Sequence, residues 1–212
     1  MAAAREYGKP DFFTTFTCNR RWRELEATLL GSQSPADRPD ITARVFQLKR
    51  AALPLDFFRN HGRGRPAVRL YAAEFHKRGV PRAHISVILH AADERRSTDD
   101  YDRFVFVELP AGGDGPGLWY TVTTCMARGP CGTSSPEAPC VEAGECAADG
   151  AMAEKRGALF ANRRAAPYKK WLARRYNAHI SVEIRSTVQA AKYIYKYVYK
   201  GPGRAVVRIG PE

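Results

Sequence analysis

The sequence lacks three features that would each assign it to a large class of proteins. It has no apolar run long enough to cross a bilayer and no clear amphipathic anchor, so we expect no membrane partner. Its first residues, MAAAREYGKP, contain no apolar segment of the kind that a secretory signal requires. It also has no GxxxxGKS or GxxxxGKT loop, so we expect no helicase or ATPase motor in this chain.

Cysteine is scarce, and its number is odd: five in 212 residues. Without a secretory signal, this count favours a reducing compartment with metal ligation or free thiols over disulfides. The spacing of four of them, C-x5-C-x8-C-x5-C, is looser than that of most zinc sites, so structural Zn²⁺ and free thiols both stay open. These four are Cys125, Cys131, Cys140 and Cys146.

Acidic residues are almost missing from residues 158–200. The net charge is +12, and residues 158–200 hold ten Lys and Arg against one acid, Glu183. A basic surface interleaved with aromatic residues suits a phosphate backbone and stackable bases, so we expect a nucleic-acid partner. The candidate contacts are Arg82, Arg174, Arg175, Lys192, Lys196 and Lys200.

The length and the hydrophobic content of 44% predict one domain over residues 1–212. Residues 129–157, rich in Gly, Pro, Ala and acids, are expected to form an excursion within it. Alternating and β-branched patterns predict strands at residues 12–17, 68–76, 83–90, 101–110 and 178–184. Helical patterns occur at residues 20–30, 40–60 with an Asp40 cap, 167–176 and 187–199, and residues 117–126 fit a short helix or strand. This order predicts an α+β fold with a central, mostly antiparallel sheet and packed helices.

The strands at 68–76 and 83–90 are joined by KRGVP and predict a hairpin. If pairing is symmetric about this turn, with opposite positions summing to about 158, Glu74 faces His84 and His76 faces Arg82. Two imidazoles and a carboxylate on one patch can hold a hard divalent cation, Mg²⁺ or Mn²⁺, and leave positions open for a phosphate. The alternative is that these histidines are simply packed or solvated.

KYIYKYVYKG at residues 192–201 contains four tyrosines and three lysines. The Ser186 or Thr187 cap and the Gly201 stop favour a helix over a strand. On a helix, Tyr193 and Tyr197 lie one turn apart beside a row of lysines. The alternative is an aromatic stripe packed against a sheet.

Six blocks in this order resemble the Helitron helicase-like domain, the HUH-type rolling-circle initiator portion of Helitron transposases. The blocks are PDFFTTFTCN, RPDITARVFQLK, EFHKRGVPRAHISVIL, RGPCGTSSPEAPC, PYKKWLARRYNAHISVE and AAKYIYKYVYKGP. The resemblance implies an HUH endonuclease-like fold, a metal at the histidine hairpin, a single-stranded DNA partner and a nuclear location. It implies that Tyr193 and Tyr197 are nucleophiles that leave a 5′-phosphotyrosine. A full-length relative is expected to continue into a helicase domain, which is absent here.

The sequence departs from the family pattern at the metal motif. Where the family has His, a small or apolar residue and His, this chain has Arg82, Ala83 and His84. An arginine cannot ligate a metal, so we hypothesise that His76 supplies the lost imidazole, with Glu74 as third ligand. Three functions therefore stay open: a tyrosine endonuclease, a degenerate DNA-binding fragment of a transposon, and a zinc-stabilised protein-interaction domain.

Overall fold

The structure is a computed structural model of the chain. It describes residues 10–57, 65–75, 79–93, 104–127, 141–142, 145–146, 152–155, 158–161, 165–184 and 205–209. The chain divides into two compact units, one of residues 1–101 with 182–212 and one of residues 102–181. The expected single domain with an excursion at 129–157 stays a prediction. Within the described ranges, no helix combines the length and apolar character needed to span a membrane.

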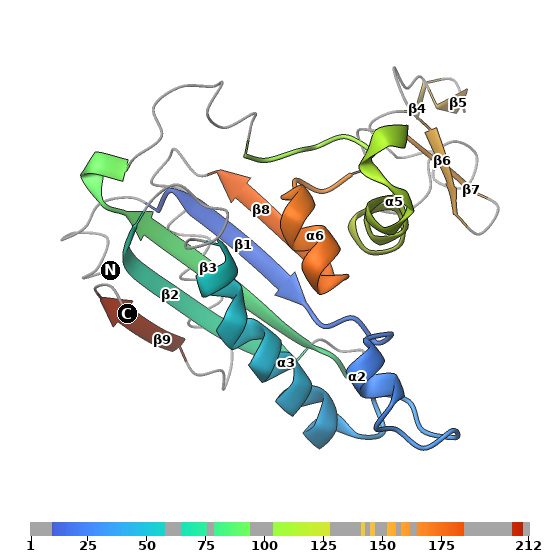
Figure 1. The fold of residues 1–212 in the computed structure, drawn as a ribbon, viewed down its shortest axis with the longest axis horizontal. Coiled ribbons are helices and arrows are strands. Elements are labelled where there is room, and N and C mark those ends of the chain that lie inside the picture. Colours follow the sequence, from blue (N-terminus) through green and yellow to red (C-terminus); the bar gives the residue numbers. More distant parts are fainter. Residues whose placement is uncertain are drawn as a thin grey trace. The chain divides into compact units, whose positions relative to one another are not determined.

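A five-stranded sheet in the order β8-β1-β3-β2-β9 dominates the first unit (Figure 1). Its strands are β1 (Phe12–Thr17), β2 (Pro66–Phe75), β3 (Pro81–Leu89), β8 (His179–Ile184) and β9 (Ala205–Ile209). Strand β3 pairs antiparallel with both β1 and β2, and β9 pairs antiparallel with β2. With the helices described below, this arrangement confirms an α+β fold with an antiparallel sheet.

Helix α3 (Pro39–Leu55) lies across one face of this sheet (Figure 1). Proline suits the first helical position, because its φ is already helical and its missing N–H would have no partner there. The N-cap is therefore Arg38, and the predicted cap at Asp40 is wrong. The Asp40 carboxylate lies in the first turn and pairs with the Arg38 guanidinium at 2.8 Å.

Aromatic rings join α3 to the sheet. The Phe46 ring stacks on Phe16 of β1 with centroids 5.0 Å apart and on Trp22 with centroids 6.4 Å apart. Trp22 directly precedes helix α2 (Arg23–Glu26), which is shorter than the predicted helix over residues 20–30. Farther along α3, the Arg50 guanidinium lies 4.0 Å from the centroid of the Tyr71 ring on β2. All three stacked rings are buried, so each stabilises the fold by about 1.5–3 kcal/mol through loss of water contact.

The second unit is built around helices with a separate apolar core. Helix α5 (Pro116–Thr121) continues into the π-helix η4 (Val122–Met126), so residues 117–126 are helical and form no strand. Helix α6 (Lys170–Tyr176) packs in the same unit. The core of this unit consists of Leu109, Leu118, Val122, Met126, Ala166, Tyr168 and Ala173. Two short hairpins complete the described part of the unit: β4 (Val141–Glu142) with β5 (Glu145–Cys146), and β6 (Met152–Lys155) with β7 (Ala158–Ala161).

The predicted strand at residues 101–110 is wrong for the part that the structure describes. Between residues 104 and 110, the β-pairing is an isolated bridge of Phe106 with Tyr168, in which each backbone N–H donates to the other carbonyl at 2.8 Å. The aromatic residues here serve core packing, because Phe104 is buried and the Phe106 ring packs against the core of the second unit, whereas Val107 is exposed. The predicted helix at residues 187–199 lies outside the described residues.

Candidate functional site

The β2–β3 hairpin carries the residues that the sequence assigned to a metal. Side chains alternate between the two faces of a strand, so Arg82 and His84 on β3 share a face. The opposite face of β1 and β3 packs against α3, because Thr14, Leu53 and Ile85 line one small apolar cavity between them. The face of His84 therefore lies on the other side of the sheet from α3.

The register of the hairpin differs from the predicted one by two residues. Glu74 pairs with Arg82, and His84 pairs with Ala72, so the predicted pairing of Glu74 with His84 is wrong. A slip of two residues keeps every side chain on its face, and for this reason the apolar pattern alone could not detect it. The turn contains Gly79 with φ +77°, a left-handed conformation that glycine adopts without steric cost.

Despite this shift, Glu74 and His84 meet diagonally. The Nε2 atom of His84 lies 2.9 Å from the Oε1 atom of Glu74. The His84 side chain is 6% exposed, whereas that of Glu74 is 43% exposed, so the pair reaches from the sheet toward solvent. An imidazole nitrogen and a carboxylate oxygen at this separation are two donors that one divalent cation can share.

Residues of strand β1 contact the His84 ring at its Nδ1 atom and on one of its faces. Thr15 pairs directly with His84, and its hydroxyl oxygen lies 3.4 Å from Nδ1. The Phe13 ring stacks on the imidazole with centroids 5.8 Å apart and planes 11° apart. The Glu74 carboxylate can only accept, so without a cation the Nε2–H of His84 donates to it; a bound cation would take the place of that hydrogen, and Nδ1–H would then donate to the Thr15 hydroxyl. The sequence analysis missed both contacts, because they depend on pairing between strands about seventy residues apart.

Arg82 occupies the position between Thr17 on β1 and Glu74 on β2. Its Nε–H donates to the hydroxyl of Thr17 at 3.1 Å. The guanidinium cannot act as a ligand, since it has no lone pair available to a metal.

The described residues contain two of the three predicted metal ligands. No group of three His, Cys, Asp or Glu side chains suited to a metal occurs among them. His76, the third predicted ligand, lies outside the described residues. The donor set of Glu74 and His84 thus fits part of an Mg²⁺ or Mn²⁺ site, with one nitrogen and one carboxylate.

The four cysteines proposed for zinc are only partly described. Cys125 is a half-buried free thiol in η4, and Cys146 lies in β5. Cys131 and Cys140 lie outside the described residues, so the zinc site stays a prediction. Cys18, which the sequence analysis did not single out, is a buried free thiol, and burial raises its pKa to about 12.

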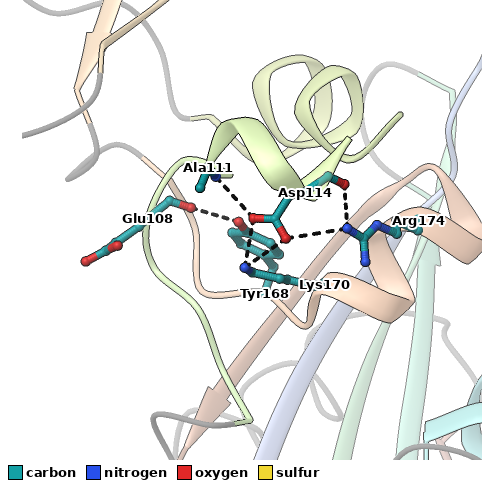
Figure 2. A network of polar contacts seen from close by, with 6 residues as sticks. All are labelled: Glu108, Ala111, Asp114, Tyr168, Lys170 and Arg174. Atoms are coloured by element: carbon teal, nitrogen blue, oxygen red, sulfur yellow. Dashed lines mark hydrogen bonds and ion pairs between the residues drawn. The ribbon is translucent and has the colours of Figure 1, made fainter. Parts of the chain in front are cut away.

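Two of the candidate DNA contacts, Arg174 and Arg175, lie on α6. An Arg174 Nη donates to the backbone carbonyl of Asp114 and approaches its carboxylate at 3.4 Å (Figure 2). Lys170 donates to the same carboxylate at 2.8 Å. This hydrogen bond from Lys170 is the largest cause that lowers the pKa of Asp114. The Arg175 guanidinium lies 5.8 Å from the centroid of the Trp171 ring.

The remaining predicted site residues lie outside the described part of the chain. They are the nucleophile candidates Tyr193 and Tyr197 and the candidate DNA contacts Lys192, Lys196 and Lys200. Their roles stay predictions.

Comparison with known proteins bears on the N-terminal part of the chain. No curated protein matches the sequence. Residues 1–87 match the family described as "Helitron helicase-like domain at N-terminus". The matched segment contains β1, α3, β2 and most of β3, and with them Glu74 and His84. The N-terminal region of this chain is therefore similar to the Helitron helicase-like domain.

Proposed function

We propose that this chain is a metal-dependent single-stranded DNA endonuclease and strand transferase of a Helitron-like rolling-circle transposon, acting in the nucleus. The observation that carries the proposal is the 2.9 Å contact of Glu74 with His84, inside the segment that is similar to the Helitron helicase-like domain. In this proposal, His84, Glu74 and His76 hold Mg²⁺ or Mn²⁺, and the basic residues bind the DNA backbone. Structural Zn²⁺ at Cys125, Cys131, Cys140 and Cys146 is a further part of it.

The protein residues would prepare the site before any bond changes. When bound, a divalent cation would polarise the phosphodiester and offset its charge. With a cation in place of the hydrogen on Nε2, the Thr15 hydroxyl would accept a hydrogen bond from Nδ1–H of His84 and hold the ring in this tautomer. The stacked Phe13 ring limits the rotation of the imidazole and excludes water from one of its faces.

The cleavage step would use the phenol of Tyr193 or Tyr197. The phenol loses its proton, and its oxygen forms a bond to phosphorus. The bond from phosphorus to the 3′ oxygen breaks, and that oxygen takes up a proton and leaves as a 3′-hydroxyl. A free phenol has a pKa of about 10, so nearby lysines are needed to favour the phenolate. Two tyrosines permit two successive cleavages, and the phosphotyrosine bond retains the energy for rejoining.

The test is a covalent-adduct gel with labelled single-stranded oligonucleotides in Mn²⁺ or chelator. We expect a Mn²⁺-dependent adduct that disappears in a Tyr193→Phe/Tyr197→Phe double variant. His84→Ala should lower the adduct rate by about 100-fold or more, and Thr15→Val by about tenfold, because one removes a ligand and the other its orienting partner. His90→Ala, at an exposed histidine just after β3, is the matched control and should leave the rate unchanged.

A second candidate function is a DNA-binding module that no longer cleaves. The observation that favours it is Arg82, whose positive charge sits across from Glu74 and opposes a divalent cation there. This function predicts salt-sensitive DNA binding without any adduct. An adduct that appears only in Arg82→His, which restores the imidazole typical of the family, would identify Arg82 as the cause of lost cleavage.

A further inference from the structure

The side chain of Arg82 is fixed in a way that a simple surface arginine is not. It projects from β3, the middle strand of the sheet, and is half-buried between the neighbouring strands. Its Nε–H donates to the hydroxyl of Thr17, the residue directly across on β1, at 3.1 Å. A hydrogen bond at Nε restricts rotation of the guanidinium plane and leaves the outer edge of the group, with Nη1 and Nη2, for other partners.

That outer edge has no protein partner in the part of the chain that the structure describes. Within the described residues, the Arg82 side chain forms its hydrogen bond to Thr17 through Nε. Neither Nη atom forms a hydrogen bond or an ion pair with a described residue. A planar guanidinium with two parallel N–H groups matches two oxygens of a phosphate. Its orientation by Thr17 lowers the entropy that would be lost when such a ligand binds.

We propose that Arg82 binds one backbone phosphate of single-stranded DNA directly, without a metal, beside the pair formed by Glu74 and His84. The inference rests on the DNA partner of the proposed function, but not on cleavage. It assigns phosphate binding to Arg82, the residue that replaces a metal ligand of the family pattern. The guanidinium would place the strand by two hydrogen bonds and a charge, and no covalent bond would change.

The charges around Arg82 affect how strongly a phosphate would bind there. Glu74 lies directly across from Arg82, and its carboxylate repels a phosphate when no cation is bound. On the other side, the chain leaves β1 with the Cys18 N–H donating to the Pro81 carbonyl at 3.0 Å. It then passes through Arg20 and Arg21, both exposed, which would extend a basic path for the strand. Metal-free binding should therefore weaken without Arg82 and strengthen when Glu74 is neutral.

The test measures binding of a fluorescein-labelled single-stranded oligothymidylate by anisotropy in chelator, across a salt series. Arg82→Gln is expected to weaken binding about tenfold. It should also reduce the slope of log affinity against log salt concentration by the amount expected for the loss of about one phosphate contact. Arg82→Lys keeps the charge but not the fork and should lose about threefold. Thr17→Val should lose a similar factor, because the charge stays while its orientation is released. Glu74→Gln should bind about threefold more tightly.

Arg44→Gln is the matched control, because it removes one positive charge from an exposed position on α3, on the other side of the sheet. An Arg82→Gln variant that behaves like Arg44→Gln in affinity and salt slope would overturn the proposal. So would an Arg82→Gln variant that loses thermal stability but keeps the slope, since the role would then be structural. Absence of any DNA binding by the unaltered chain in chelator would overturn it too. Absence of a covalent adduct in Mn²⁺ would refute only the endonuclease, because the phosphate contact does not require cleavage.

Discussion

Two buried side chains in this protein are held in their neutral forms. Burial raises the pKa of Cys18 and the pKa of Tyr168, each to about 12. The Tyr168 hydroxyl donates to the Glu108 carbonyl at 2.8 Å (Figure 2), a bond that the ionised phenolate could not donate. Both groups favour the folded state while they are protonated.

These shifts predict loss of stability at alkaline pH. A raised pKa in the folded state gives stability that is present below the unfolded value and is lost as the pH rises through the folded value. For Tyr168 that window runs from about pH 10, the ordinary value, to about pH 12. We expect the contribution of Tyr168 to the free energy of unfolding in urea to fall by about 2 kcal/mol across this window, in addition to the contribution of Cys18. In Tyr168→Phe the fall should be smaller, although stability at neutral pH drops by about 1 kcal/mol from the lost hydrogen bond.

Tyr120→Phe provides the comparison for this alkaline series, since its phenol is on a side chain 46% exposed. The pH dependence of Tyr120→Phe should follow that of the unaltered protein. If the free energy of unfolding fell equally with pH in all three proteins, the loss of stability at alkaline pH could not be assigned to Tyr168.

Among the elements, we expect α3 to depend on the aromatic contacts of Phe46 more than on its helical propensity. Phe46 stacks on both Phe16 and Trp22, whose rings also contact each other with centroids 5.9 Å apart, and it is 3% exposed. We expect Phe46→Ala to lower the free energy of unfolding by about 3–5 kcal/mol, because it leaves a cavity beside two rings. Denaturant titration followed by tryptophan fluorescence measures this directly, with Trp22 as the neighbouring reporter.

Leu48→Ala on the same helix is the control, because Leu48 is 74% exposed. It replaces a large apolar residue with alanine at an equal helical position, and we expect a change within about 0.5 kcal/mol. Similar losses in both variants would show that helix formation, and not contact with the sheet, controls the stability.

In the second unit, Asp114 connects the end of the 3₁₀-helix η3 (Gly112–Asp114) to α6. Its carboxylate accepts from Lys170 at 2.8 Å and from the Ala111 N–H at 3.1 Å (Figure 2). Asp114→Asn should lower the free energy of unfolding at neutral pH by about 1 kcal/mol, since it removes the charge that Lys170 meets. The lowered pKa of Asp114 means that this contribution is present above its ordinary range and is lost as the pH falls through the folded value.

Urea titrations at neutral pH and below the ordinary carboxyl range test this prediction. The difference between Asp114→Asn and the unaltered protein should shrink in acid. Asp40→Asn removes an ion pair with Arg38 that is exposed to solvent, and we expect a smaller effect. A difference for Asp114→Asn that persists in acid would point to lost packing instead of lost charge.

The sequence predicts elements in this protein better than it predicts their pairing. The FFTTFT pattern predicted β1 at its observed bounds, and β3 and β8 lie close to their predicted ranges, because alternation and β-branching are local properties. The register of the hairpin was wrong, since a two-residue slip preserves both faces. The contact of Thr15 with His84 was not foreseen, because strand order is not encoded in any one segment.

For the molecule as a whole, the segment similar to the Helitron helicase-like domain corresponds to the centre of the sheet. Residues 1–87 include β1, β2 and most of β3, which are the three inner strands. The two edge strands, β8 and β9, come from residues 179–184 and 205–209. Glu74 and His84 could be placed from this N-terminal part, whereas the candidate nucleophiles Tyr193 and Tyr197 and five of the six candidate DNA contacts come from the other half of the sequence.

This strand order has a consequence for synthesis on the ribosome. The inner strands have all been made once residue 89 has been added, but β2 obtains its outer neighbour only when β9 has been made at residues 205–209. At ordinary elongation rates, that interval lasts on the order of ten seconds. During this time the outer edge of β2 presents unpaired N–H and carbonyl groups, and such an edge can pair with any extended segment nearby. A nascent chain of this protein thus has the greatest need of a chaperone after its inner strands have formed and before its last strand is complete.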